Sequence, residues 1–189
     1  MIESSSFIEL LKKRDNVAFN QLIDHFQNIV YNNLLIIVQH EQDAEDLTQE
    51  VFIRIHKSID NFRGDAKLST WIYRITYTTA LEWERKKKAL RAINYFKNLI
   101  GINESKQAIS HFDHPGIAIE NKERANVLFK ALKTLPENQR IAFLLIKSEG
   151  LSYLEVSEIM NKSIKSIEGL IQRAKENLRM SLEDYYNNN

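Results

Sequence analysis

The sequence predicts an all-α fold made of two small helical domains joined by a partly ordered linker. The 189-residue chain has only five glycines and two prolines, too few turn formers for a β-sandwich or barrel. Apolar residues also recur at helical spacing over most of the chain. This periodicity weakens between positions 91 and 119, so we expect domains at 1–90 and 120–189 with a linker at 91–119.

The composition excludes several classes of protein. Without cysteine, the chain has no disulfide framework, thiol nucleophile or cysteine zinc site. No apolar run reaches about 18 residues, the length that spans a membrane, and the polar N-terminus does not resemble a signal peptide. We therefore expect a cytoplasmic protein. No nucleotide-binding, hydrolase or metalloprotease motif occurs, so we expect no catalytic residues, no enzymatic activity and no cofactor.

A histidine pair is the one candidate for a metal cluster. His111 and His114 flank Asp113 in the expected linker. A stable zinc site needs about four ligands at suitable spacing, and no further ligand lies near this pair in the sequence. We therefore expect no metal site.

Charge is distributed unevenly although the net charge is only +1. Residues 1–50 contain three basic and nine acidic residues, a net charge of −6. Residues 51–91 contain ten basic and four acidic residues, a net charge of +6. Two neighbouring segments of opposite sign indicate two surfaces that bind different partners.

Three helices are expected in the first domain, at Val17–Val38, Asp43–Lys57 and Thr70–Lys88. The second of them has an apolar face and an opposite acidic face. The apolar face is formed by Ala44, Leu47, Val51 and Ile55. The acidic face, which includes Asp46, suits a basic partner surface, although a plain solvated face would have the same composition.

The helix at Thr70–Lys88 carries an aromatic and basic stripe opposite its apolar face. The stripe consists of Trp71, Arg74, Thr78 and Arg85, with Tyr77 at its border. Cations hold phosphates and aromatic rings stack on exposed bases, so the stripe suits a nucleic-acid strand. The preceding loop, 61–69, could form a pocket for a base pulled out of a duplex. The alternative is that the aromatic residues belong to the core.

The C-terminal region has the layout of a helix-turn-helix. Ser152 and Glu155 fit a capping box that starts a short helix. A turn at 161–163 follows, in which Asn161 tolerates the left-handed conformation. The last helix is expected to bury Ile164, Ile167, Ile171, Ala174 and Leu178. Its outer face would then present residues that suit base edges and phosphates, although a solvated amphipathic helix is the alternative.

Five segments resemble the extracytoplasmic-function (ECF, group IV) sigma factors of bacteria, and they occur in that family's order. Asp43–Phe52 resembles the polymerase-binding helix, and Phe62–Ile75 resembles the promoter-melting segment. Leu135–Arg140 and Glu149–Tyr153 resemble the start of the C-terminal domain, and Arg173–Lys175 resembles the end of the recognition helix.

The resemblance implies a promoter-specificity subunit with a sigma-2 domain, a sigma-4 domain and three partners: core RNA polymerase, promoter DNA and an anti-sigma factor. It assigns polymerase binding to Asp43, Asp46, Gln49 and Glu50. It assigns recognition and melting of the minus-ten element to Arg63, Lys67, Ser69, Thr70, Trp71, Arg74, Tyr77, Thr78 and Arg85. It assigns reading of the minus-thirty-five element to Ser163, Lys165, Ser166, Glu168, Gly169, Gln172 and Arg173.

Two other functions fit parts of the same sequence. A stand-alone helix-turn-helix repressor would explain the C-terminal pair of helices, and it would bind its operator tightly without polymerase. A helical adaptor that binds only proteins would explain the amphipathic helices. Charge reversal at Lys165 and Arg173 would leave transcription unchanged if the chain were such an adaptor.

Overall fold

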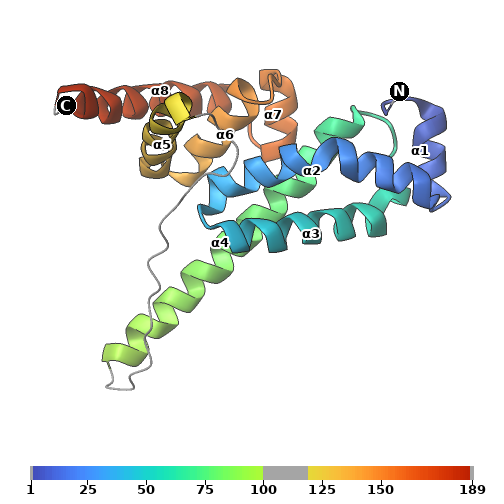
Figure 1. Cartoon of the computed structure of the whole chain (residues 1–189), viewed down its shortest axis with the longest axis horizontal. Coiled ribbons are helices and arrows are strands. Elements are labelled where there is room, and N and C mark those ends of the chain that lie inside the picture. The colour runs from blue at the N-terminus through green and yellow to red at the C-terminus, as the bar shows by residue number, and fades with distance from the viewer. Residues whose placement is uncertain (1, 100–118, 188–189) are drawn as a thin grey trace.

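The computed structural model describes residues 2–99 and 119–187, and the regular elements in these ranges are all helices (Figure 1). In chain order they are α1 (Ser5–Lys12), α2 (Asn16–Val38), α3 (Glu41–Ser58), the 3₁₀ turn η1 (Ile59–Asn61), α4 (Leu68–Leu99), α5 (Ile119–Thr134), α6 (Glu137–Lys147), α7 (Tyr153–Met160) and α8 (Ile164–Asn187). The all-α prediction is confirmed.

The expected helices of the first domain are present to within two residues at their ends, except for the end of α4, and α1 is an additional helix. Helix α1 was not expected, because a helix of eight residues that buries only Phe7 and Leu11 has too few apolar positions to show a period. Helix α4 continues to Leu99, eleven residues beyond the expected end at Lys88. No glycine or proline occurs between Lys88 and Gly101, so nothing in this stretch interrupts the helix.

The N-terminal helices begin at side-chain caps. The Asp15 carboxylate accepts a hydrogen bond from the Ala18 N–H at 2.8 Å and so satisfies an amide at the start of α2. Because capping aspartates stabilise by about 1 kcal/mol, we expect Asp15→Ala to lower the free energy of unfolding by that amount in urea titrations. Asp24→Ala, at an exposed position on the same helix, is the matched control and should change it little.

Helices α2, α3 and α4 pack on one another through their apolar faces. Leu22, Val30, Val51 and Ile72 are fully buried there. The predicted apolar face of α3 is confirmed, since all four of its residues are buried. This packing turns the opposite face of α3 outward.

The turn between α7 and α8 follows the sequence prediction closely. The Ser152 hydroxyl accepts from the Glu155 N–H, and the Glu155 carboxylate accepts from the Ser152 N–H, so the capping box is present. Asn161 has the left-handed φ of 50°, and the Ser163 hydroxyl caps α8 by accepting from the Ser166 N–H at 3.2 Å. Ile164, however, is 42% exposed, because the first residue of α8 lies beyond the helices against which α8 packs.

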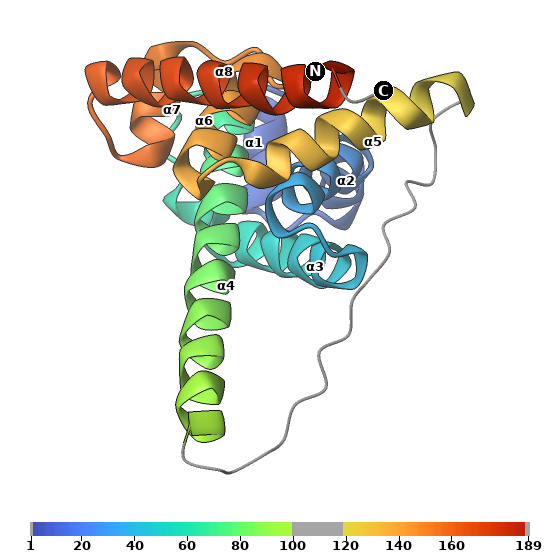
Figure 2. The same cartoon turned by 90° about the vertical axis from the view of Figure 1, so that its left-hand side faces the viewer.

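The two halves of the chain lie against each other. Helix α4 packs on α7, and α2 packs on α6 and α5, so the main cluster of buried apolar residues runs through both halves. Lys88 of α4 forms an ion pair with Glu137 of α6 at 2.7 Å. The C-terminal part of α4 projects away from the other helices (Figure 2).

Candidate functional site

The acidic face of α3 is divided between exposed and paired side chains. Asp46 and Gln49 are exposed. Asp43 forms an ion pair with Lys87 of α4 at 3.4 Å. The four predicted polymerase-binding residues therefore lie on one helix, and the exposed pair is open to a partner.

Glu50, the fourth residue of this face, belongs to a small charged network. The Arg54 guanidinium joins Glu50, one turn earlier on α3, to Glu82 on α4, where the Nη2–Oε2 distance is 2.7 Å. The hydrogen bond from Arg54 lowers the pKa of Glu82 and keeps it ionised. The network ties α3 to α4 and fixes the orientation of the acidic face.

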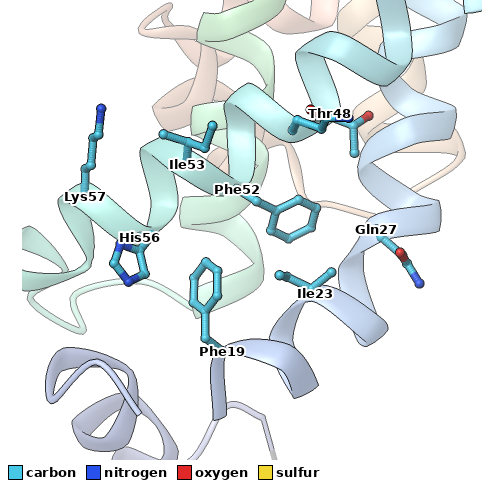
Figure 3. A pocket seen from close by; sticks show the side chains of 9 residues that line it. Phe19, Ile23, Gln27, Thr48, Phe52, Ile53, His56 and Lys57 are labelled. Atoms are coloured by element: carbon cyan, nitrogen blue, oxygen red, sulfur yellow. The ribbon is translucent and has the colours of Figure 1, made fainter. Parts of the chain in front are cut away.

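An apolar groove of about 560 Å³ lies beside this face, between α2 and α3 (Figure 3). Phe19 and Ile23 of α2 point toward Phe52 of α3, and the Phe19 ring meets the His56 ring edge-on at 4.9 Å. Gln49 also lines the groove and thus connects it to the acidic face.

Sequence reasoning missed this groove. Phe19 and Ile23 fit the buried face of α2, and their periodicity gives no sign that they are only partly buried. Ile53 offered a usable signal, since it lies outside the apolar face of α3 and is 52% exposed. An apolar side chain on the solvent side of an amphipathic helix often marks a contact surface.

The loop before α4 forms the hollow that its composition suggested. Residues 61–66 line a cavity of about 350 Å³ together with Thr70, Trp71 and Arg74. The Trp71 ring is half-buried and lies 5.4 Å from the Phe62 ring, with an angle of 53° between the planes. Glu158 and Ile159 of α7 close one side of the hollow.

The other residues predicted to bind the minus-ten element differ in exposure. Arg63, Lys67, Arg74 and Arg85 are exposed, and Ser69 and Thr78 are partly exposed. Thr70 and Tyr77 are only 4% and 5% exposed because the C-terminal half covers them. This burial raises the pKa of Tyr77 to about 12 and keeps its phenol neutral. Sequence periodicity placed Tyr77 beside the stripe, and the family resemblance assigned Thr70 to the same surface; neither could foresee this cover.

Four hydrogen-bond donors at the start of α4 are bound by carboxylates from distant parts of the chain. Glu3 accepts from the backbone N–H groups of Leu68 and Ser69, at 2.7 and 3.1 Å. Glu155 accepts from the Thr70 hydroxyl at 3.2 Å, and Glu149 accepts from the Tyr73 hydroxyl at 2.7 Å. Burial, with Glu149 nearby, raises the pKa of Tyr73.

The expected outer face of α8 is open to solvent. Its exposed residues are Ser163, Lys165, Ser166, Glu168, Gln172 and Arg173. The Arg173 guanidinium lies 3.5 Å from the point where a side chain at Gly169 would begin, so the two residues are in ordinary van der Waals contact on this face. Glu168 and Gln172 line a shallow depression with Tyr153 of α7.

Neither a metal cluster nor a membrane-spanning helix is found in the described part of the chain. No group of three or more histidine, aspartate or glutamate side chains in this part is placed to hold a metal ion. His111 and His114 lie outside the described residues. No helix in the described ranges is long and apolar enough to cross a membrane.

Comparison with known proteins identifies two family regions in the chain. Residues 22–90 match Sigma-70 region 2, and residues 126–178 match Sigma-70, region 4. ECF RNA polymerase sigma factor SigW of Bacillus subtilis (strain 168) is 30% identical over 182 residues, which cover 94% of this chain and 95% of SigW. ECF RNA polymerase sigma-E factor of Escherichia coli (strain K12) is 30% identical over 178 residues, which cover 89% of this chain and 88% of the sigma-E factor.

Solved structures share the fold. CnrH, in complex with the cytosolic domain of CnrY, superposes with a TM-score of 0.66 at 20% identity and covers 94% of this chain and 96% of its own. The sigma factor RpoE, in complex with the anti-sigma factor NepR from Bartonella quintana, has a TM-score of 0.63 at 22% identity. The match covers 87% of this chain and 96% of the RpoE chain. With two matching regions and relatives that match along nearly their whole length, the chain belongs to the ECF RNA polymerase sigma factors, a family of transcription initiation factors.

Proposed function

We propose that this sigma factor uses three separate surfaces to bring core RNA polymerase to a promoter and to open the promoter DNA. The exposed face of α3 binds polymerase, the hollow around Trp71 receives the minus-ten element, and the outer face of α8 reads the minus-thirty-five element. The observation that carries the proposal is that each surface combines the family's motif with side chains open to solvent.

The polymerase surface combines charge with an apolar contact. Asp46 and Gln49 supply exposed polar groups, and the neighbouring groove between Ile23 and Phe52 supplies apolar area. Interfaces of this kind bury an apolar centre inside a polar rim. The acidic rim suits a basic polymerase surface, because charge complementarity speeds and orients association.

The minus-ten surface fits a single strand rather than a duplex. The hollow has the partly exposed ring of Trp71 on one side and the guanidinium of Arg74 nearby. A base leaving the duplex gains stacking energy on such a ring, while cations hold its phosphates. We expect strand opening to begin at this position.

The minus-thirty-five surface gives a direct prediction for paired charge reversal on α8. We expect Lys165→Glu together with Arg173→Glu to reduce transcription by at least about thirtyfold, since two base or phosphate contacts are lost and each contributes about 1–3 kcal/mol. The measurement is run-off transcription with reconstituted polymerase. Lys133→Glu with Lys147→Glu, two exposed lysines outside α8, is the control with the same charge change. Equal losses in both pairs would contradict a specific role for α8.

An anti-sigma factor is a further proposed partner. One solved structure with the same fold holds CnrH with the cytosolic domain of CnrY, and another holds the sigma factor RpoE with the anti-sigma factor NepR. We propose that this chain is held in the same manner before its signal arrives. The chain isolated from unstressed cells of its source should elute with a smaller partner and not with polymerase, as size-exclusion chromatography and mass spectrometry can establish.

The experiment that tests the main proposal is reconstituted transcription. Core polymerase of the source bacterium, combined with the purified chain, should initiate at specific promoters of that genome. Tight binding to an operator without polymerase in a gel-shift assay, with no initiation, would instead indicate a stand-alone repressor.

A further inference from the structure

The far end of α4 carries an apolar face that no other helix covers. This part of α4 projects away from the other helices (Figure 2), and its Leu90 and Ile93 side chains are 60% and 50% exposed. Residues three positions apart share one face of a helix, so the two side chains form a short apolar strip. Single exposed apolar residues are common on proteins, whereas neighbouring ones on a projecting element mark a contact surface.

Cations flank this strip. Positions 85–93 contain five basic residues and no acidic one. Two of the five are held in ion pairs with α3 and α6, but Lys86 and Arg91 are exposed and form no ion pair within the described part of the chain. Lys86 precedes Leu90 by four positions and so lies on the same face of the helix. The strip and its two unpaired cations are called the α4 tip below.

The groove between α2 and α3 has the complementary features. It has a volume of about 560 Å³, and Ile23 and Ile53 are among the apolar residues that line it. Asp24 and Asp46 are exposed, and each lies within one helical turn of a residue that lines the groove. Lys57 lines only one end of it (Figure 3). The apolar lining therefore fits the strip of the α4 tip, and the acidic rim fits its cations.

The α4 tip and the groove cannot meet within one chain. Helix α4 is continuous, and the ion pair between Lys87 and Asp43 anchors it on α3. Its far end points away from α2 and α3 in both views (Figures 1 and 2). The two surfaces can therefore meet only between copies, and the net charge of +1 leaves little repulsion to keep copies apart.

We propose that the free chain binds a second copy of itself by seating the α4 tip of one copy in the groove of the other. Leu90 and Ile93 enter the apolar groove, and Lys86 and Arg91 face its acidic rim. Because the two surfaces differ, the contact is heterologous and can extend to further copies. This self-association goes beyond the proposed function and does not depend on it.

Self-association has one consequence for the proposed function. The groove supplies the apolar area of the surface proposed to bind polymerase, so a copy seated in it covers that surface. This consequence alone rests on the proposed function. If polymerase bound the associated chain without dispersing it, the role of the groove in polymerase binding would be wrong, and the contact between copies would stand.

The first test is sedimentation equilibrium of the purified full-length chain without polymerase or DNA. Small interfaces bind weakly, so the measurement extends to about 100 µM. The average mass should rise with concentration from the monomer value of 22.2 kDa to at least twice that value. A constant monomer mass over the whole range would overturn the inference.

Two variants remove one side of the contact each. The tip variant carries Leu90→Gln with Ile93→Gln, which keeps the net charge and suits a helix. The groove variant carries Ile53→Arg, which places a cation against the basic tip. All three positions are exposed, so the changes spare the fold. We expect both variants to remain monomeric at every concentration tested, and association at the level of the unchanged chain would overturn the inference.

Matched controls alter exposed apolar residues elsewhere. Leu128→Gln with Met180→Gln matches the tip variant, and Leu10→Arg on α1 matches the groove variant; these three residues are 44–49% exposed. We expect both controls to associate as the unchanged chain does. Equal losses in variants and controls would indicate non-specific clustering of apolar side chains and contradict a defined contact.

Salt separates the charged part of the contact from its apolar part. About 0.5 M sodium chloride shortens the screening length to about 4 Å, so we expect the association constant of the unchanged chain to fall severalfold. Contacts between apolar surfaces alone do not weaken with added salt. An unchanged or larger association constant would contradict the pairing of the cations with the acidic rim.

A mixture of the two variants tests whether the α4 tip and the groove bind each other. The tip variant keeps an intact groove and the groove variant keeps an intact tip, so an equimolar mixture retains one productive contact. We expect the average mass of the mixture to rise toward twice the monomer mass and no further, because the other tip and the other groove in each pair are altered. This recovery also shows that both variants are folded. A mixture that stays monomeric, while the unchanged chain associates, would overturn the proposed contact.

Discussion

Replacing Asp46 with arginine is expected to weaken binding to core polymerase by about a hundredfold. Asp46 is exposed on α3 and, within the described part of the chain, forms no ion pair, so the change spares the fold. Reversal places a cation against a surface that attracts the acidic face, and like charges at an interface cost several kcal/mol. Affinity can be measured with purified core enzyme by surface plasmon resonance.

The matched control for this experiment is Glu9→Arg. Glu9 is an exposed carboxylate on α1, outside the acidic face, and its reversal changes net charge equally. We expect the control to bind polymerase nearly as well as the unchanged chain, and both variants to melt at similar temperatures. If Asp46→Arg bound with unchanged affinity, the assignment of polymerase binding to this face would be wrong.

Replacing Trp71 with alanine is expected to reduce promoter opening by about tenfold to a hundredfold while polymerase binding is retained. The half-buried ring lies over the hollow beside Phe62, and stacking of one base on an aromatic ring contributes about 1–3 kcal/mol. Permanganate reactivity of unpaired thymines reports opening, and the assay used for Asp46 reports polymerase binding.

The conservative change Trp71→Phe separates stacking from packing. Phenylalanine keeps an aromatic face for a base, and we expect it to restore a large part of promoter opening. Equal loss of opening and of polymerase binding in Trp71→Ala would indicate that Trp71 mainly supports the core. Its partial exposure already shows that part of the ring is accessible.

The sequence predicts those features that depend on neighbouring residues. Ser152 and Glu155 define a capping box because both partners lie within one turn, and the left-handed Asn161 follows from the backbone tolerance of that residue. The apolar face of α3 follows from helical spacing. The exposed residues of the candidate site, including Asp46 and Gln172, were predicted from the same patterns.

Features that depend on residues far apart in the sequence could not be predicted from it. The hydrogen bond between Tyr73 and Glu149 joins residues 76 positions apart, and no local pattern encodes it. The cover over Thr70 and Tyr77 arises from packing between the two halves. The extension of α4 was missed because the basic run from Arg85 to Lys88 interrupts the apolar period without breaking the helix.

Glu155 performs two tasks, since one carboxylate both caps α7 and accepts from Thr70. Selection acting on either task constrains the other. A substitution at Glu155 would therefore loosen the start of α7 and remove a contact to α4 at the same time, whereas a substitution at Glu149 would remove only the hydrogen bond from Tyr73. Position 149 is thus free to vary at the junction between the two halves, while position 155 is held by its second task.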